Sequence, residues 1–403
     1  MKKLIAIDLF CGAGGLSEGL VQAGFQVNFA SDINSTYIQT YKYNHPNTHV
    51  YTEDICKLSN EKVIQLSQMK PGELDLLAGG PPCQGFSINA PVRTMSDHRN
   101  HLFLEFLRIA EVLKPKYILI ENVPGIISLE KGAVVKAIYH YLSKLGYKTK
   151  HMILFAAHYG VPQMRWRTFF LATRLVNAKC IFPTPTHFAT GVANFTGAKA
   201  LCFKVDSKYN LFNSNLLDYT TVWDAISDLH SLHNGGGKEE STYVLPPQSS
   251  YQENLRQGSQ KVYNHQVPNL GKINLERLKY IPQGGSWRDI PFELLPAGLK
   301  RARRSDHTKR YGRLNPEGLC STILTKCDPH WGSFFHPTQN RVISVREAAR
   351  IQSFPDRFRF LGSVTEQYEQ VGNAVPPFVA KALGKEIIEQ ILSNESDSQL
   401  EVV

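Results

Sequence analysis

Short apolar runs alternate with segments of helical spacing along the first part of the chain. The runs are too short for helices and are bounded by turn residues, so they predict buried strands. These runs cover residues 4–9, 26–31, 74–78 and 117–120. Apolar residues at helical spacing predict helices over 102–113, 133–145 and 344–352, and a last helix to about residue 392. Strands and helices that alternate in this way are typical of an open α/β sheet.

The polar and apolar pattern changes from about Pro183. The stretches 149–157 and 167–173 predict a hairpin. From about Pro183 to Asn340 the chain is rich in turn residues and has little periodicity. A chain of 403 residues exceeds what one hydrophobic core usually fills. We therefore predict a second, turn-rich lobe in this region.

Composition narrows the class of protein. The hydrophobic content of 42% and the charged content of 20% are ordinary for a soluble protein, and no apolar run reaches membrane-spanning length. Asp8 lies in the first apolar run, which favours a strand over a signal peptide. Seven cysteines without a Cys-x-x-Cys pair predict a reducing cytoplasm, with no disulfide framework and no metal site. The net charge of +10 and the pI of about 9.1 favour an anionic partner such as nucleic acid.

A glycine-rich turn follows the first predicted strand. It contains Gly12, Gly14 and Gly15, and a helix is expected to begin just after it. Glycines let the backbone approach a ligand at a helix N-terminus. Ser17 stands where a dinucleotide-binding turn has its third glycine, so the pattern favours a single nucleoside over a pyrophosphate cofactor.

Two acidic residues follow later strands. Asp32 ends the second strand, at the spacing where a carboxylate binds a ribose diol. Asp54 and Ile55 follow a third, poorly marked strand and suit the edge and face of an adenine. Helix capping is the alternative for Asp32 and also for Asp54.

Two reactive side chains follow buried strands. Cys83 lies on the Pro-framed turn Gly79–Ser87, which would fix its sulfur as a nucleophile; a buried structural cysteine is the alternative. Glu121 ends the strand 117–120, and a salt bridge is the alternative to general acid catalysis. The polar stretch 88–100 is long enough to be a loop that closes over a site.

Two groups of basic residues could bind anions. Arg165 and Arg167 alternate, so on one strand they would point the same way, either toward an anion or toward solvent. A second group gathers in the turn-rich lobe and predicts nucleic-acid binding, with a solvated face as the alternative. This basic cluster consists of Lys300, Arg301, Arg303, Arg304, Lys309, Arg310 and Arg313.

Together these stretches resemble the bacterial cytosine-5 DNA methyltransferases. The resemblance rests on six motifs in the family's order. They are Asp8–Gly15, Gly79–Gln84, Glu121–Pro124, Gln163–Arg167, Arg346–Pro355 and Gln370–Asn373. The remainder of the chain, chiefly about 184–220 and 230–280, is not covered by them.

The resemblance implies an S-adenosylmethionine-dependent methyltransferase with a Rossmann-like α/β fold and a mostly parallel seven-stranded sheet. It implies a catalytic and cofactor-binding domain over 1–183 and a target-recognition domain over 184–340. The segment 341–403 would return to the catalytic domain. It also implies that Cys83 adds to carbon 6 of a flipped-out cytosine, that Glu121 contacts ring nitrogen 3 and that Arg165 contacts the carbonyl oxygen.

The resemblance assigns further residues to the two ligands. To the cofactor it assigns Phe10, Gly12, Gly14, Gly15, Asp32, Ile33, Asp54, Ile55, Leu102 and Asn373. To DNA we assign Gln84, Ser87, Arg167, Arg301, Arg303 and Arg304. The expected partner is double-stranded DNA, bound by a cytoplasmic monomer that protects host DNA alongside a restriction endonuclease. The alternatives are a tRNA cytosine-5 methyltransferase and an inactive DNA-binding regulator.

Overall fold

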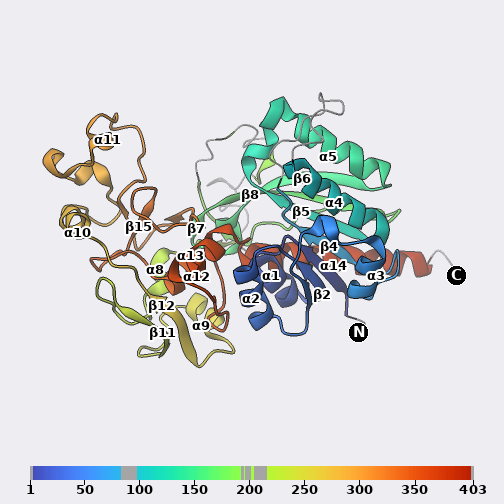
Figure 1. Ribbon diagram of the computed structural model, residues 1–403, viewed down its shortest axis with the longest axis horizontal. Coiled ribbons are helices and arrows are strands. Elements are labelled where there is room, and N and C mark those ends of the chain that lie inside the picture. Colours follow the sequence, from blue (N-terminus) through green and yellow to red (C-terminus); the bar gives the residue numbers. More distant parts are fainter. Residues whose placement is uncertain (1–2, 83–97, 192–194, 196–200, 204–215, 401–403) are drawn as a thin grey trace. The chain divides into compact units, whose positions relative to one another are not determined.

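The structure is a computed structural model that describes residues 3–82, 98–191, 195, 201–203 and 216–400. Cys83, Gln84 and Ser87 lie outside the described residues. The chain forms two compact units (Figure 1). Unit 1 comprises Met1–Tyr159, Trp166–Leu216 and Val375–Val403, and unit 2 comprises Gly160–Arg165 and Leu217–Ala374. The predicted functional division at 183/184 and 340/341 stays a prediction.

Unit 1 is built on a seven-stranded sheet with the order β3-β2-β1-β4-β5-β8-β6. The five strands β3, β2, β1, β4 and β5 pair in parallel, and β8 pairs antiparallel with both β5 and β6. The strands are β1 (Ile5–Leu9), β2 (Gln26–Ser31), β3 (His49–Tyr51), β4 (Leu76–Gly79), β5 (Tyr117–Asn122), β6 (Lys148–Phe155) and β8 (Trp166–Thr173). This sheet confirms the predicted fold class and the predicted hairpin.

The central strands are buried because they lie between helices, which explains their continuous apolar runs. The helices of unit 1 are α1 (Gly15–Ala23), α2 (Ser35–Asn44), α3 (Asn60–Ser67), α4 (His98–Leu113), α5 (Ala133–Lys144) and α14 (Pro377–Leu400). Short 3₁₀ turns are η1 (Ile55–Lys57), η2 (Pro124–Ile127), η3 (Leu129–Gly132) and η4 (Ala156–Tyr159), and β9 covers His187–Phe188.

The last helix packs closely on the first. A Cβ atom on Gly19 of α1 would lie 2.3 Å from the Pro377 carbonyl oxygen and 2.4 Å from the Ala380 Cβ atom of α14. The backbones therefore approach where only glycine fits. The end of the chain thereby covers the helix that follows the glycine-rich turn.

Unit 2 is made of short elements, which confirms the predicted turn-rich character. Its helices are α8 (Val222–Ile226), α9 (Ser250–Arg256), α10 (Lys272–Leu278), α11 (Ala297–Lys300), α12 (Val345–Ile351) and α13 (Val364–Asn373). Its strands are β7 (Gln163–Met164), β10 (Leu217–Asp218), β11 (Gly237–Thr242), β12 (Lys261–Gln266), β13 (Gly312–Arg313), β14 (Cys320–Ser321) and β15 (Ser333–Phe335). The turns η5 (Trp287–Asp289) and η6 (Phe292–Leu294) complete it.

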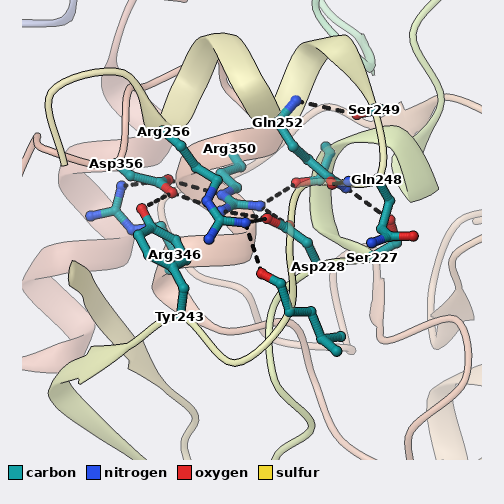
Figure 2. Close-up of polar contacts among 12 residues, drawn as sticks. Ser227, Asp228, Tyr243, Gln248, Ser249, Gln252, Arg256, Arg346, Arg350 and Asp356 are labelled. Atoms are coloured by element: carbon teal, nitrogen blue, oxygen red, sulfur yellow. Dashed lines mark hydrogen bonds and ion pairs between the residues drawn. The ribbon is translucent and has the colours of Figure 1, made fainter. Parts of the chain in front are cut away.

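A buried ionic network joins distant segments of unit 2 (Figure 2). Arg350 donates from Nε to Asp356 Oδ1 at 2.9 Å and from Nη2 to Asp356 Oδ2 at 2.7 Å. Its Nη1 donates to the Ala225 carbonyl at 3.0 Å and also to Asp228. Arg256 donates to the other oxygen of Asp228 at 2.8 Å. The segment Arg346–Pro355, noted above as a motif, thus helps to hold unit 2 together.

Among the helices that the structure describes, none is both long and apolar enough to cross a membrane.

Candidate active site

The glycine-rich turn adopts a backbone that only some residues tolerate. After β1, the φ angles of Phe10, Gly12 and Gly14 are 59°, 55° and 103°. A Cβ atom on Gly14 would lie 2.9 Å from the Tyr41 ring and 3.0 Å from a ring nitrogen of His45. Gly14 is also the N-cap of α1 and provides no side-chain cap. The turn therefore presents backbone N–H groups at the start of a helix, where a ligand can approach them.

Asp32 is tied to this turn. Gly12 N donates to Asp32 Oδ2 at 2.9 Å, and Asn34 N donates to Asp32 Oδ1 at 2.9 Å. The capping alternative for Asp32 is wrong, because Asn34 is the N-cap of α2 and accepts from Tyr37 N. Burial raises the pKa of Asp32, while the backbone donors of Asn34 and Gly12 oppose that shift. A carboxylate oxygen with one donor retains acceptor capacity for a hydroxyl.

The sequence did not predict the buried polar contacts of Asp8 behind the turn. Ser17 donates to Asp8 Oδ2 at 2.6 Å, and its hydroxyl lies 2.8 Å from the Tyr41 hydroxyl. Asp8 is fully buried, and within the described chain its Oδ1 has no hydrogen-bond partner. Burial raises the pKa of Asp8 to about 7, while the Ser17 hydrogen bond opposes the shift and the charge of Asp32 adds to it. The only sequence signal was an acid inside an apolar strand.

The other residues predicted to bind the cofactor differ in burial, in hydrogen bonding and in the unit to which they belong. Asp54 caps η1 by accepting from Cys56 N at 3.0 Å, so its capping alternative is observed. Ile55 is buried, whereas Ile33 is 69% exposed. Leu102 is half-buried against the core of unit 1. Asn373 is the last residue of α13 and belongs to unit 2.

The strand that leads to Cys83 ends beside Glu121. β4 pairs with β5 in the register Gly79 to Ile120. Asn122 Nδ2 donates to the Pro81 carbonyl at 3.2 Å. A Cβ atom on Gly80 would lie 3.2 Å from Glu121 Oε2. The segment that continues to Cys83 therefore starts next to this carboxylate, while Cys83, Gln84 and Ser87 themselves lie outside the described residues.

Glu121 forms an ion pair with Arg167. Arg167 Nε lies 2.9 Å from Glu121 Oε1, and the two side chains are 16% and 15% exposed. Arg167 also donates from Nη1 to the Trp166 carbonyl at 2.8 Å. Burial lowers the pKa of Arg167, and the charge of Glu121 opposes that shift. The salt-bridge alternative for Glu121 is thus observed, at an edge of the sheet that water reaches in part.

Arg165 is placed differently from Arg167. It lies between β7 and β8, so the prediction that both arginines alternate on one strand is wrong. The side chain is buried and donates to carbonyls of unit 2: Nη1 to Ile323 at 3.2 Å, and Nη2 to Gly372 at 2.8 Å and Ala374 at 2.9 Å. The predicted contact of Arg165 with a base stays a prediction.

The basic cluster of unit 2 divides into two parts. Arg301, Arg303 and Arg304 are exposed, which both the predicted anion contacts and the alternative of a solvated face require, and Arg304 also donates to the Arg288 carbonyl at 2.8 Å. Arg313 is half-buried and donates to the Leu278 carbonyl at 2.9 Å. Within the described residues, no group of three or more His, Cys, Asp or Glu side chains could hold a metal ion.

Comparisons with known proteins agree with this arrangement. The family model described as C-5 cytosine-specific DNA methylase matches residues 4–389. The chain is 34% identical to the type II methyltransferase M.DdeI of Desulfomicrobium norvegicum, over 94% of this chain and 88% of that protein. It is 32% identical to the DNA (cytosine-5)-methyltransferase PliMCI of Paracentrotus lividus, over 96% of this chain and 28% of that protein. The chain spans less than a third of the length of such animal relatives.

A solved structure matches over nearly the whole chain. It is the crystal structure of a putative DNA modification methyltransferase encoded within a prophage of E. coli. The TM-score is 0.70 and the identity 26%, covering 97% of this chain and 100% of that one.

Proposed function

Since the chain belongs to the C-5 cytosine-specific DNA methylase family, we propose that it transfers a methyl group from S-adenosylmethionine to carbon 5 of a cytosine in duplex DNA. The family model and M.DdeI confirm the predicted family, and enzymes of this family and fold use S-adenosylmethionine as the methyl donor. The observation that supports the proposal most is the position of Gly80 beside Glu121, because it starts the Cys83 segment next to the carboxylate.

The cofactor fits the cradle in unit 1. When bound, S-adenosylmethionine supplies an electrophilic methyl group. The backbone of Gly12 and Gly14 would approach it closely, and Asp32 would accept from the ribose hydroxyls. Asp8 keeps a buried oxygen without a hydrogen-bond partner in the described chain, as expected below a polar ligand.

Cys83 and Glu121 would carry the reaction at the base. Carbon 5 of cytosine is a poor nucleophile, so the Cys83 thiolate adds to carbon 6 and forms a carbon–sulfur bond. The electron pair displaced to carbon 5 would then form the bond to the methyl group, while the sulfonium sulfur–methyl bond of the cofactor would break and leave S-adenosylhomocysteine. Glu121 would have to take up a proton before it could donate one, or a hydrogen bond, to ring nitrogen 3, and this donation limits the charge that builds on the ring. Loss of the proton from carbon 5 to a base then releases the thiolate.

The base must leave the duplex for this chemistry. A stacked cytosine cannot bring carbon 6 to a thiol, so the cytosine is flipped out. Arg167 is the arginine that lies beside Glu121, and we propose that it positions this carboxylate. The contact of Arg165 with the carbonyl oxygen of the base stays a prediction.

The biological setting is also a proposal. The type II methyltransferase names among the relatives favour protection of host DNA alongside a restriction endonuclease, without stable contact between the two proteins. We expect a cytoplasmic monomer. A tRNA cytosine-5 methyltransferase and an inactive DNA-binding regulator are not favoured by these relatives.

Transfer of labelled methyl groups tests the proposal. Purified protein should transfer label from S-adenosylmethionine to plasmid DNA and not to bulk tRNA. Cys83→Ser should bind DNA but transfer no label, because an alkoxide is far less available than a thiolate at neutral pH. Label in tRNA would favour the RNA alternative, and no transfer by the wild type would favour the inactive regulator. Turnover by Cys83→Ser near the wild-type rate would exclude Cys83 as the nucleophile.

A further inference from the structure

An exposed tryptophan on unit 2 has an arginine stacked on its ring. The Trp331 side chain is 60% exposed. The Arg310 guanidinium lies 5.0 Å from the centroid of its indole. Arg310 belongs to the basic cluster defined above, whereas the sequence assigned no function to Trp331.

The pairing of two short strands brings these residues together. β13 and β15 run parallel, in the register Gly312 to Ser333. Arg310 and Trp331 each precede that register pair by two residues, so they occupy equivalent positions at the start of the ladder. The ladder therefore brings the backbones of the two residues close enough for their side chains to stack.

The backbone around the ring is held in place. Trp331 N donates to the Asp328 carbonyl at 3.0 Å, and Tyr311 N donates to the Pro329 carbonyl at 2.6 Å. The hydroxyl of Ser333 donates to the Lys309 carbonyl at 3.1 Å. Unit 2 thus holds a large apolar ring at its surface on a fixed turn, whereas such rings usually find cover.

The contrast with another stacked pair in unit 2 is informative. Arg256 lies 3.6 Å from the Tyr243 ring centroid, but both side chains also bond to buried aspartates. For Arg310 and Trp331 the described part of the chain offers no side-chain hydrogen bond or ion pair. The first pair is thus tied into the buried ionic network of unit 2, whereas the second lies at the surface.

We propose that Trp331 and Arg310 form a contact site for duplex DNA, with the indole against base surface and the guanidinium on a neighbouring phosphate. The chemistry matches, because apolar and aromatic side chains pack against bases and arginine neutralises phosphates. The exposed cations Arg303 and Lys309 precede the pair in the same segment and extend its positive charge. The site rests on the proposed function in that DNA is the substrate.

Binding of a target duplex to variants of the full chain tests this site. Trp331→Ala should weaken binding by about 5-fold, the lower end of the roughly 5- to 150-fold range for one base–aromatic contact on single strands, because the bases of a duplex are already stacked on one another. The slope of log affinity against log salt should stay the same, since no charge is removed. Arg310→Ala should reduce that slope by about 0.9, as for one lost phosphate contact. Trp331→Phe should keep most of the affinity, and Val244→Ala, which trims another exposed apolar residue of unit 2, should change nothing.

Control measurements on Trp331→Ala and on the wild type distinguish a failure of this site from a failure of the proposed function. Thermal unfolding and S-adenosylmethionine affinity should be unchanged in Trp331→Ala, because the side chain is exposed and lies outside the cofactor cradle. Unchanged DNA affinity in Trp331→Ala, with a wild type that methylates DNA, would overturn this site and leave the proposed function intact. A wild type that neither binds nor methylates duplex DNA would overturn both.

Discussion

Unit 2 uses arginine in two opposite ways. Arg350 is fully buried, and its guanidinium donates to two carboxylates and a carbonyl (Figure 2). Arg301 and Arg303 are exposed, and no ion pair joins them to an acid within the described residues. The same side chain therefore stabilises the lobe in one place and stays available to an anion in another.

The difference follows from the small elements of this unit. Unit 2 has a hydrophobic core that includes Leu278, Trp287 and Tyr311. Charged hydrogen bonds between its segments add to this core in fixing the short helices and two-stranded sheets. Burial alone would raise the pKa of Asp356, but the charge and hydrogen bonds of Arg350 lower it below its usual value. Such a network depends on every member, since a buried charge without its partner is costly.

Removing the buried arginine should have the largest effect. Arg350→Ala leaves Asp228 and Asp356 buried with fewer donors, and we expect a loss of about 3–5 kcal/mol in the free energy of unfolding. Urea unfolding measures it. Arg303→Ala is the matched control on the surface and should change stability by less than about 0.5 kcal/mol. Equal stability of the two variants would contradict the contrast between the two classes of arginine.

The neighbouring arginines of the Gln163–Arg167 motif extend the comparison. Arg167→Ala should lower kcat about 100-fold or more with little change in the melting temperature, because Glu121 loses its partner. Arg165→Ala should instead destabilise the protein by about 1–3 kcal/mol, since buried carbonyls lose their donor. If Arg165→Lys lowers kcat at an unchanged melting temperature, the base contact predicted for Arg165 gains support.

The Asp32 carboxylate accepts from two backbone N–H groups, and substituting it should weaken cofactor binding rather than reduce stability. Asp32→Asn keeps the shape of the side chain but removes the charge that receives the ribose hydroxyls. We expect S-adenosylmethionine binding to weaken by about 1.5–3 kcal/mol, measured by calorimetry. Asp54→Asn tests the second predicted acid in the same assay, and unchanged affinity there would leave Asp54 as the cap of η1 alone. Unchanged affinity in Asp32→Asn would remove Asp32 from the cofactor site.

The exposed arginines should show a salt effect. Neutralising Arg301, Arg303 and Arg304 together removes up to three phosphate contacts, so the slope of log affinity against log salt should fall by nearly three units. Affinity should drop on matched and scrambled duplexes alike. A smaller change in slope with relaxed preference at one base pair would indicate that one arginine reads a guanine edge. An unaltered slope and preference would mean that the cluster faces water.

The sequence was most informative where a pattern reports a local environment. Apolar runs gave the central strands, because strands buried on both faces have few polar positions. The contact between Ser17 and Tyr41 could not be predicted, since packing alone joins residues 24 positions apart. Arg165 and Arg167 look equivalent in the motif, but the break between β7 and β8 separates their surroundings. The exposure of Trp331 depends on the register of β13 and β15, which no local pattern reports.

Bisulfite sequencing of DNA from cells that express the protein tests the central claim most directly. The wild type should leave cytosines that resist conversion at one recurring sequence, and Cys83→Ser, expressed at the same level, should leave none. The recurring sequence would also identify the recognition site. Complete conversion of all cytosines in wild-type cells, or the same protected cytosines with Cys83→Ser, would contradict the assignment of this chain as a cytosine-5 DNA methyltransferase that acts through Cys83.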